Sequence, residues 1–229
     1  MPLAIQARSV GEITILACNG RIVEGEESAA LHASVEKLLP RQPHILLDLT
    51  GVSFIDSAGL GTLLRLRALA QAAAGDLKIC AVNSHFREVL RTTKLLAVLV
   101  PYESEEPAIT AFYTPTETDD GRALMAVDVL CVHSSANVAA YARELLRQAG
   151  YGTTTATNLS DARVLMSATR PSVVVIPSEW QANFAALAGG GSEDHLRIVF
   201  WPPHFSTEDA GDAAKQLLSG VASGLAGAG

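Results

Sequence analysis

An acid and a hydroxyl stand side by side in residues 52–64, VSFIDSAGLGTLL, where an apolar segment becomes a leucine-rich one. Asp56 and Ser57 are residue types that can cap a helix, take part in a catalytic site, or present a hydroxyl to a kinase. A cap needs only a side-chain oxygen near the first backbone N–H groups of the helix. The two chemical roles need further groups elsewhere in the chain.

A nucleophilic serine needs a base within hydrogen-bond reach and a third group that orients the base. The six histidines of the chain stand in no recognisable setting for that role. The strand-to-helix pattern Gly-x-Ser-x-Gly is absent because residue 55 is Ile, and Gly59 and Gly61 lack the further residues of a phosphate-binding loop. His133 and His204 lack a third ligand with metal-binding spacing. We therefore expect no catalytic site, no metal and no cofactor.

Strands and helices are predicted to alternate around Asp56 and Ser57. Residues 44–49, HILLDL, form a continuous apolar run, which is typical of a central strand covered on both faces. The other predicted elements of this half are a hairpin of residues 3–7 and 13–17, helices at 24–39, 59–73, 84–93 and 105–112, and strands at 77–82 and 97–101. This order predicts an α/β domain with a mostly parallel sheet and a hairpin at its edge.

The longer stretch LLDLTGVSFIDSAGLGTLL, residues 46–64, closely resembles the signature of STAS domains, which occur in bacterial anti-sigma factor antagonists and at the cytoplasmic ends of sulfate transporters. The resemblance covers residues 2–112. In antagonists of this family, a partner that is both serine kinase and anti-sigma factor phosphorylates the residue directly after the Asp, and the resemblance assigns that position to Ser57. Asp56, Gly59 and Leu60 match the same motif, whereas Ala58 replaces a second serine found in many members.

A hydroxyl at the start of a helix suits a switch, because it is exposed and rigidly presented to a partner and a kinase. A phosphate there adds a charge of about −1.5 to −2. The helix dipole tolerates this anion, but Asp56 and an acidic partner surface repel it. Phosphorylation of Ser57 is therefore expected to weaken docking with little loss of stability. The alternative is a scaffold or assembly module that is not phosphorylated, in which Ser57 only caps its helix.

Residues 113–124 are polar, contain Pro and Gly and lack a period, so they are predicted to be a linker between domains. A second α/β series follows over residues 125–229. Its pattern resembles the first β-α units of response-regulator receiver domains, with about one β-α unit missing. The expected fold is flavodoxin-like, with a parallel sheet and helices.

The resemblance of this second half does not extend to the receiver active site. His133 and Ser134 stand where that family has the acidic pair that holds Mg²⁺, and Pro177 stands at the position of the phosphorylated Asp. Trp201 aligns with the receiver lysine. The peptide bond between Trp201 and Pro202 can be cis or trans, and the sequence leaves this open. We therefore expect a pseudo-receiver that takes no phosphoryl group.

Composition limits the classes of partner. A chain of 229 residues exceeds the usual domain of roughly 100 to 200, which favours two domains. The net charge of −7, without a cluster of Lys and Arg, disfavours nucleic acid and anionic membranes as partners. No stretch reaches the roughly 18 uninterrupted apolar residues of a membrane span, so a cytoplasmic location is expected. Cys18, Cys80 and Cys131 lie in apolar strand-like runs and are expected to be buried free thiols.

The sequence therefore predicts a non-enzymatic bacterial regulatory protein of two domains, an STAS-type mixed sheet with helices followed by a flavodoxin-like parallel sheet with helices. Its expected partner is an anti-sigma factor with serine kinase activity, or another signalling protein, in partner switching that regulates transcription. A homo-oligomer is left open. Direct binding of nucleic acid or membrane is not expected.

Overall fold

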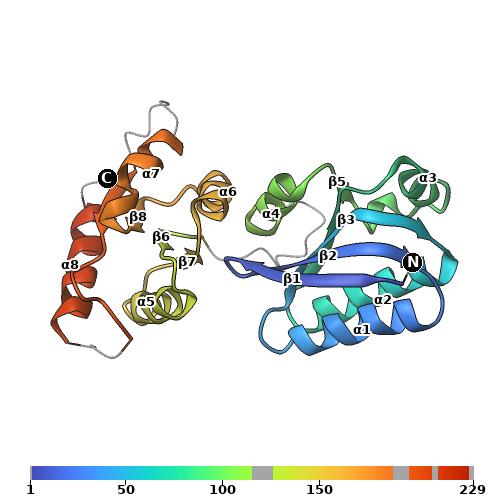
Figure 1. Ribbon diagram of the computed structural model, residues 1–229, viewed down its shortest axis with the longest axis horizontal. Helices are drawn as coiled ribbons and strands as arrows, with labels where there is room; N and C mark the ends of the chain where they lie inside the picture. The colour runs from blue at the N-terminus through green and yellow to red at the C-terminus, as the bar shows by residue number, and fades with distance from the viewer. Residues whose placement is uncertain (1, 115–125, 188–195, 208–210, 227–229) are drawn as a thin grey trace. The chain divides into compact units, whose positions relative to one another are not determined.

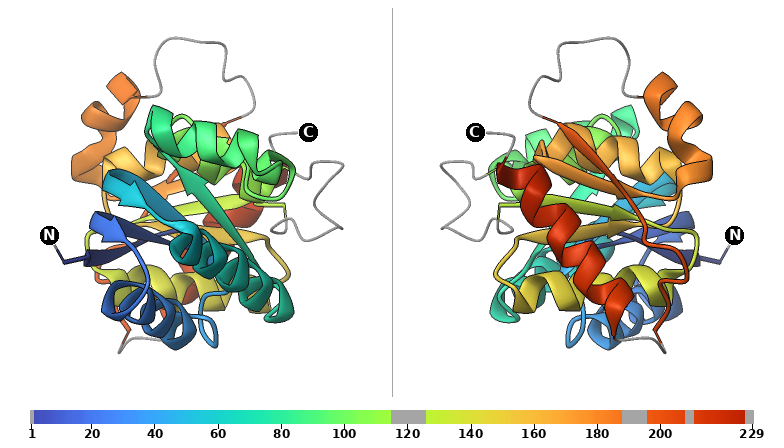
Figure 2. Two further views of the ribbon diagram at one scale, coloured as in Figure 1. Left: turned by 90° about the vertical axis from the view of Figure 1, so that its right-hand side faces the viewer. Right: turned by 90° about the vertical axis from the view of Figure 1, so that its left-hand side faces the viewer.

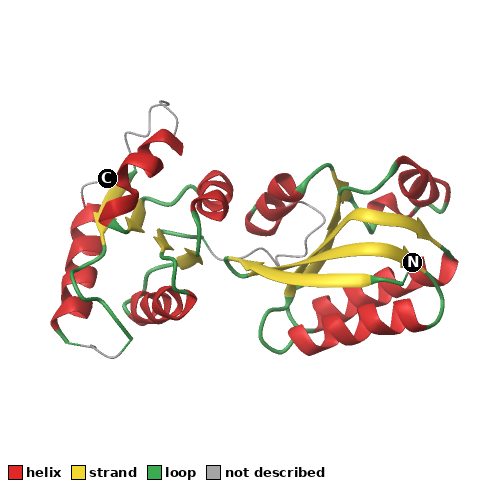
Figure 3. Ribbon diagram, viewed as in Figure 1, coloured by secondary structure: helices red, strands yellow, loops and turns green. Residues whose placement is uncertain are grey.

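The computed structural model describes residues 2–114, 126–187, 196–207 and 211–226. The chain divides into two compact units, residues 1–124 and 125–229, and each unit has its own sheet with helices (Figures 1 and 3). The predicted α/β fold class is confirmed, because the first sheet is mixed and the second is parallel throughout. The predicted linker, residues 113–124, lies outside the described residues except for 113 and 114. Among the described helices, none has the length and apolar character that a membrane crossing requires.

The first sheet has five strands in the order β1-β2-β3-β4-β5. The predicted hairpin is formed by β1 (Ala4–Val10) and β2 (Ile13–Ile22), and the remaining strands, β3 (His44–Ile55), β4 (Asp76–Cys80) and β5 (Pro101–Tyr102), run parallel to β2. β3 is six residues longer than the predicted 44–49, because it continues along β2 through register shifts. The strand therefore ends directly before Asp56.

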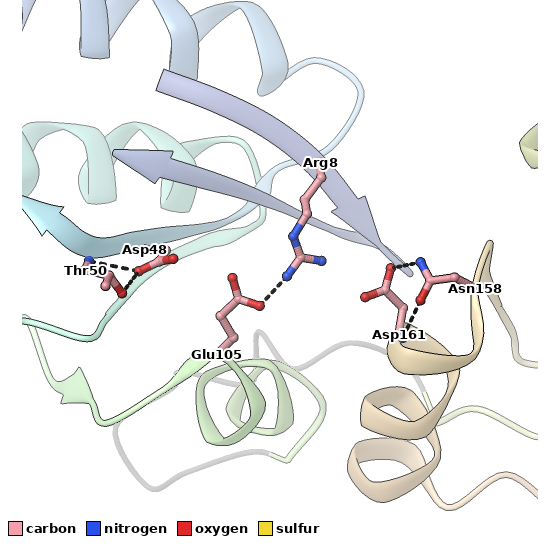
Figure 4. Close-up of polar contacts among 6 residues, drawn as sticks. All are labelled: Arg8, Asp48, Thr50, Glu105, Asn158 and Asp161. Atoms are coloured by element: carbon pink, nitrogen blue, oxygen red, sulfur yellow. Dashed lines mark hydrogen bonds and ion pairs between the residues drawn. The ribbon is translucent and has the colours of Figure 1, made fainter. Parts of the chain in front are cut away.

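Helices α1 (Glu26–Leu38) and α2 (Ser57–Ala72) pack side by side on one face of this sheet, and α4 (Glu105–Tyr113) lies on the other (Figures 1 and 2). α3 (Ser84–Thr92) follows β4. An ion pair between Arg8 of β1 and Glu105 joins the start of α4 to the sheet (Figure 4). The core between the sheet and α1 and α2 consists of aliphatic side chains, among them Leu16, Ile45, Leu47, Leu49, Leu63 and Leu66.

The strand predicted at residues 97–101 is wrong in position. Leu95–Ala97 form a 3₁₀ turn, and the strand β5 comprises only Pro101 and Tyr102. Leu95 and Leu96 pack against the core from this turn, while Val98 and Val100 remain exposed. An apolar run was therefore mistaken for a strand, because its period alone does not distinguish a buried turn from an extended segment.

In its described residues, the second unit has four parallel strands in the order β7-β6-β8-β9, namely β7 (Thr153–Ala156), β6 (Val129–Val132), β8 (Val173–Ile176) and β9 (Arg197–Phe200). This is the order of the first four strands of a flavodoxin-like sheet. One face packs against α5 (Ala136–Gln148) and α8 (Asp212–Ala226), which contribute Leu146, Leu217 and Val221 to the core. The connections also include α6 (Leu159–Thr169), the 3₁₀ turn Ser178–Trp180 and α7 (Gln181–Leu187). The Asn158 side chain caps α6 by accepting a hydrogen bond from the Asp161 N–H (Figure 4).

Candidate protein-docking site at the start of helix α2

Asp56 is the N-cap of α2 and ties the helix to the loop after β2. Its Oδ1 accepts a hydrogen bond of 2.7 Å from the Gly59 N–H, and its Oδ2 accepts one of 3.1 Å from the Glu24 N–H. These donors, first Gly59 and then Glu24, hold the pKa of the Asp56 carboxyl below its ordinary value. Asp56 is therefore an ionised cap at neutral pH.

Gly59 and Leu60 are fixed by packing. A Cβ on Gly59 would lie 2.1 Å from the Ile22 carbonyl oxygen, so only glycine lets α2 approach β2 this closely. Leu60 is buried in the core of the first unit. The motif residues Asp56, Gly59 and Leu60 thus position the start of α2 through a cap, a close backbone approach and apolar burial.

Ser57 is the first residue of α2 and is exposed. Because Asp56 is the cap, the helix does not use the Ser57 hydroxyl for capping. The interpretation in which Ser57 caps its own helix is therefore wrong, since the backbone places the neighbouring carboxylate at the N-cap. Within the described residues, the hydroxyl has no hydrogen-bond partner and is open to another molecule.

Phe54 is a further exposed side chain, three residues before Ser57 in the chain, with 43% of its surface accessible. Its ring stacks on His85 with centroids 6.5 Å apart, and its strand position is opposite Arg21 of β2. The sequence indicated only an apolar strand end here. Val52 and Ile55 are buried, whereas Phe54 between them is exposed. This arrangement depends on a register shift between β2 and β3, and the sequence gives no clear signal of that shift.

The chain segments that lead into α1 and α2 carry more acidic than basic groups. Glu24, Glu26 and Asp56 stand at the starts of α1 and α2, and Arg21 is at the end of β2. Metal binding has no support in the part of the chain that the structure describes, where no three His, Cys, Asp or Glu side chains gather. The exposed hydroxyl, the exposed ring and the charged rim are features of a surface that a protein can bind.

The four residues of the second unit that the sequence aligned with receiver active-site positions lie at the carboxyl ends of its strands. His133 and Ser134 follow β6, Pro177 follows β8 and is buried, and Trp201 follows β9. The structure brings two of these residues together, because the His133 and Trp201 rings lie 5.2 Å apart and the Trp201 Nε1–H donates a hydrogen bond of 2.8 Å to the Val132 carbonyl. All described peptide bonds are trans, including Trp201–Pro202. Protein side chains, including the Trp201 ring, therefore occupy this strand edge.

Comparison with known proteins identifies the first unit. Residues 4–108 match the family model of the STAS domain, from the edge hairpin into α4. The first unit is an STAS domain. Because the match covers the strand end and the start of α2, Asp56 and Ser57 lie inside this STAS domain.

Relatives of the STAS domain are named as anti-sigma factor antagonists. BtrV of Bordetella bronchiseptica, which is inferred to be an anti-sigma factor antagonist, is 28% identical over 101 residues. These residues are 44% of this chain and 87% of BtrV. The anti-sigma F factor antagonist of Paenibacillus polymyxa is 33% identical over 67 residues, which are 29% of this chain and 57% of that protein. Among solved structures, an anti-sigma factor antagonist of Mycobacterium paratuberculosis gives a TM-score of 0.42 at 21% identity, over 48% of this chain and 92% of that one.

Proposed function

We propose that this protein is an anti-sigma factor antagonist-like regulator without catalytic activity of its own, whose STAS domain binds an anti-sigma factor with serine kinase activity. Phosphorylation of Ser57 controls this binding. The observation that carries the proposal is the exposed Ser57 hydroxyl, which starts α2 while Asp56 provides the cap. The names of the related antagonists supply the class of partner.

The local electrostatics support a switch that acts on docking rather than on folding. A phosphate on Ser57 adds a charge of about −1.5 to −2 at a helix N-terminus, where the dipole tolerates an anion. The same charge stands beside the ionised Asp56 and near Glu24, and it makes this surface more acidic and more strongly hydrated. A partner that fits the unmodified hydroxyl has to desolvate this phosphate, so its affinity falls.

The second unit has a different role in this proposal. We infer that it is a pseudo-receiver that mediates contacts and takes no phosphoryl group, because His133, Ser134, Pro177 and Trp201 supply neither a carboxylate nor a lysine. The packed Trp201 ring supports this inference, since it occupies the strand edge. Incubation of the full chain with acetyl phosphate and Mg²⁺ tests it, and an acyl phosphate on residues 125–229 contradicts it.

Binding measurements with two variants test the function. Ser57→Ala is expected to bind the serine-kinase anti-sigma factors of the source organism like the unmodified protein, while Ser57→Asp binds at least about tenfold more weakly, or about 1.4 kcal/mol. Ser160→Asp is the matched control, because it adds the same charge to the exposed first turn of α6. Equal affinity of Ser57→Asp and wild type for a partner that binds contradicts the switch, and absence of any binding contradicts the proposed partner class.

A further inference from the structure

A groove of about 770 Å³ runs between α1 and α2 and begins beside Ser57. On α2 it is lined by Ala58, Gly61, Thr62 and Arg65, whose spacing places them on one face of the helix. Ser28, Ala29 and His32 of α1 line the opposite wall. Seven residues of helix correspond to about 10 Å, so the groove extends over two helical turns.

Gly61 has no packing role within the chain. A Cβ added there would meet no atom within 4 Å, in contrast to Gly59 in the same helix. Glycine inside a helix is less favourable than alanine, so the fold gains nothing from it. The missing side chain instead leaves room for the backbone of another molecule above α2.

The two ends of the groove carry opposite charges. Arg65 stands at one end and donates a hydrogen bond to Thr62 Oγ1, and no carboxylate of the described residues pairs with it. His32 lies on α1 at the same end, with its Nδ1 3.7 Å from Glu36. Glu24 stands at the Ser57 end of the groove. Its backbone N–H donates a hydrogen bond to Asp56, and its carboxylate has no partner among the described residues. A complementary ligand therefore carries an acid at the Arg65 end.

We propose that this groove receives a helix of the partner protein, antiparallel to α2, with acidic residues in its first turn near Arg65 and its carboxyl end near Ser57. Helices favour acids in the first turn, because the dipole is positive at the N-terminus, and the negative carboxyl end of the same dipole is repelled by a phosphate on Ser57. The small residues along the groove let the helix axes approach to about 8 Å, the lower end of ordinary helix packing. The identity of the partner rests on the proposed function, whereas the groove and its charges do not.

Gly61→Leu tests the groove without harming the fold, since the new side chain enters open space and leucine favours the helix. We expect its Kd for the serine-kinase anti-sigma factor to rise at least about tenfold, with unchanged far-UV circular dichroism. Ala30→Leu is the matched control, because Ala30 is exposed on α1 and does not line the groove. Gly61→Leu binding like wild type contradicts the proposal.

A second measurement reports on the groove directly. The three native cysteines are buried, so a bimane label attached to Gly61→Cys is expected to be the sole probe on the surface. Partner binding should shift its emission to the blue, and a label on Ala30→Cys should not respond. An unchanged label at 61 in a complex that has formed contradicts the groove. If Ser57→Asp weakens binding while both groove tests fail, the proposed function stands and the groove proposal is wrong. If no candidate partner binds the wild type, both are wrong.

Discussion

Two glycines two residues apart in α2 offer a direct test of how the start of this helix is held. A Cβ on Gly59 would meet the Ile22 carbonyl oxygen at 2.1 Å and the Ile55 Cγ1 at 2.9 Å, whereas a Cβ on Gly61 would meet nothing within 4 Å. The same substitution, Gly to Ala, should therefore have opposite effects at the two positions.

The expected magnitudes follow from these contacts. Ordinary contact begins near 3.4 Å, so Gly59→Ala forces the helix and β2 apart by more than 1 Å. The displaced Ile22 oxygen also accepts a hydrogen bond from the Asp56 N–H. Overpacking costs about 1 to 3 kcal/mol, and alanine regains up to about 1 kcal/mol of helix propensity. We expect Gly59→Ala to lower the free energy of unfolding of the STAS domain by about 2 kcal/mol, and Gly61→Ala to raise it by about 0.5 to 1 kcal/mol.

Hydrogen exchange measured by mass spectrometry on the full chain resolves the two units. The slowest amides of β2, β3 and α2 should exchange about thirtyfold faster in Gly59→Ala and more slowly in Gly61→Ala. Trp180 and Trp201 both belong to the second unit. The midpoint of the unfolding transition followed by tryptophan fluorescence is therefore an internal control and should be the same in both variants and wild type. Equal stabilisation by both alanines would refute the close approach of α2 and β2.

Three further predictions concern the cap, the thiols and the exposed ring. Asp56→Ala should lower the denaturation midpoint near pH 7. Because folding lowers the pKa of the Asp56 carboxyl, the difference in midpoint between variant and wild type should shrink as the pH falls below about 4. A difference in midpoint that stays constant down to about pH 2 contradicts the cap. Burial raises the pKa of each native thiol to about 12, so Ellman's reagent at pH 8 should find none in the folded protein and three in urea, at Cys18, Cys80 and Cys131. Phe54→Ser should weaken partner binding about tenfold without loss of stability. Leu69→Ser removes a similarly exposed apolar side chain from the last turn of α2 and should change neither the affinity nor the stability.

The order of strands and helices in the STAS domain could be predicted from the sequence, because apolar periods and turn residues mark most of its elements. The run HILLDL indicated the central strand, and the two short apolar segments at 3–7 and 13–17 indicated the hairpin. The strand predicted at 97–101 could not be corrected from the sequence, since the position of residues 95–100 depends on packing of Leu95 and Leu96 against distant parts of the chain.

The candidate site was predicted in location but not in detail. The motif indicated that Asp56 and Ser57 stand where a strand becomes a helix, and the structure confirms that place. Which of the two residues caps α2 depends on one backbone conformation, the extended φ of −98° and ψ of −178° at Asp56. The exposure of Phe54 depends on the register of β3 against β2. The groove between α1 and α2 depends on how two helices distant in sequence pack together, so it had no signal in either helix alone.

The proposed switch requires that the Ser57 hydroxyl receives a phosphate in the cell. Phosphopeptide mapping of the chain isolated from its native cells, with and without phosphatase treatment, measures this modification. The proposed switch predicts a phosphatase-sensitive phosphate on Ser57 in a fraction of the molecules and none on residues 125–229. Fully unmodified Ser57 under all growth conditions, or a phosphate confined to another residue of the STAS domain, would contradict it.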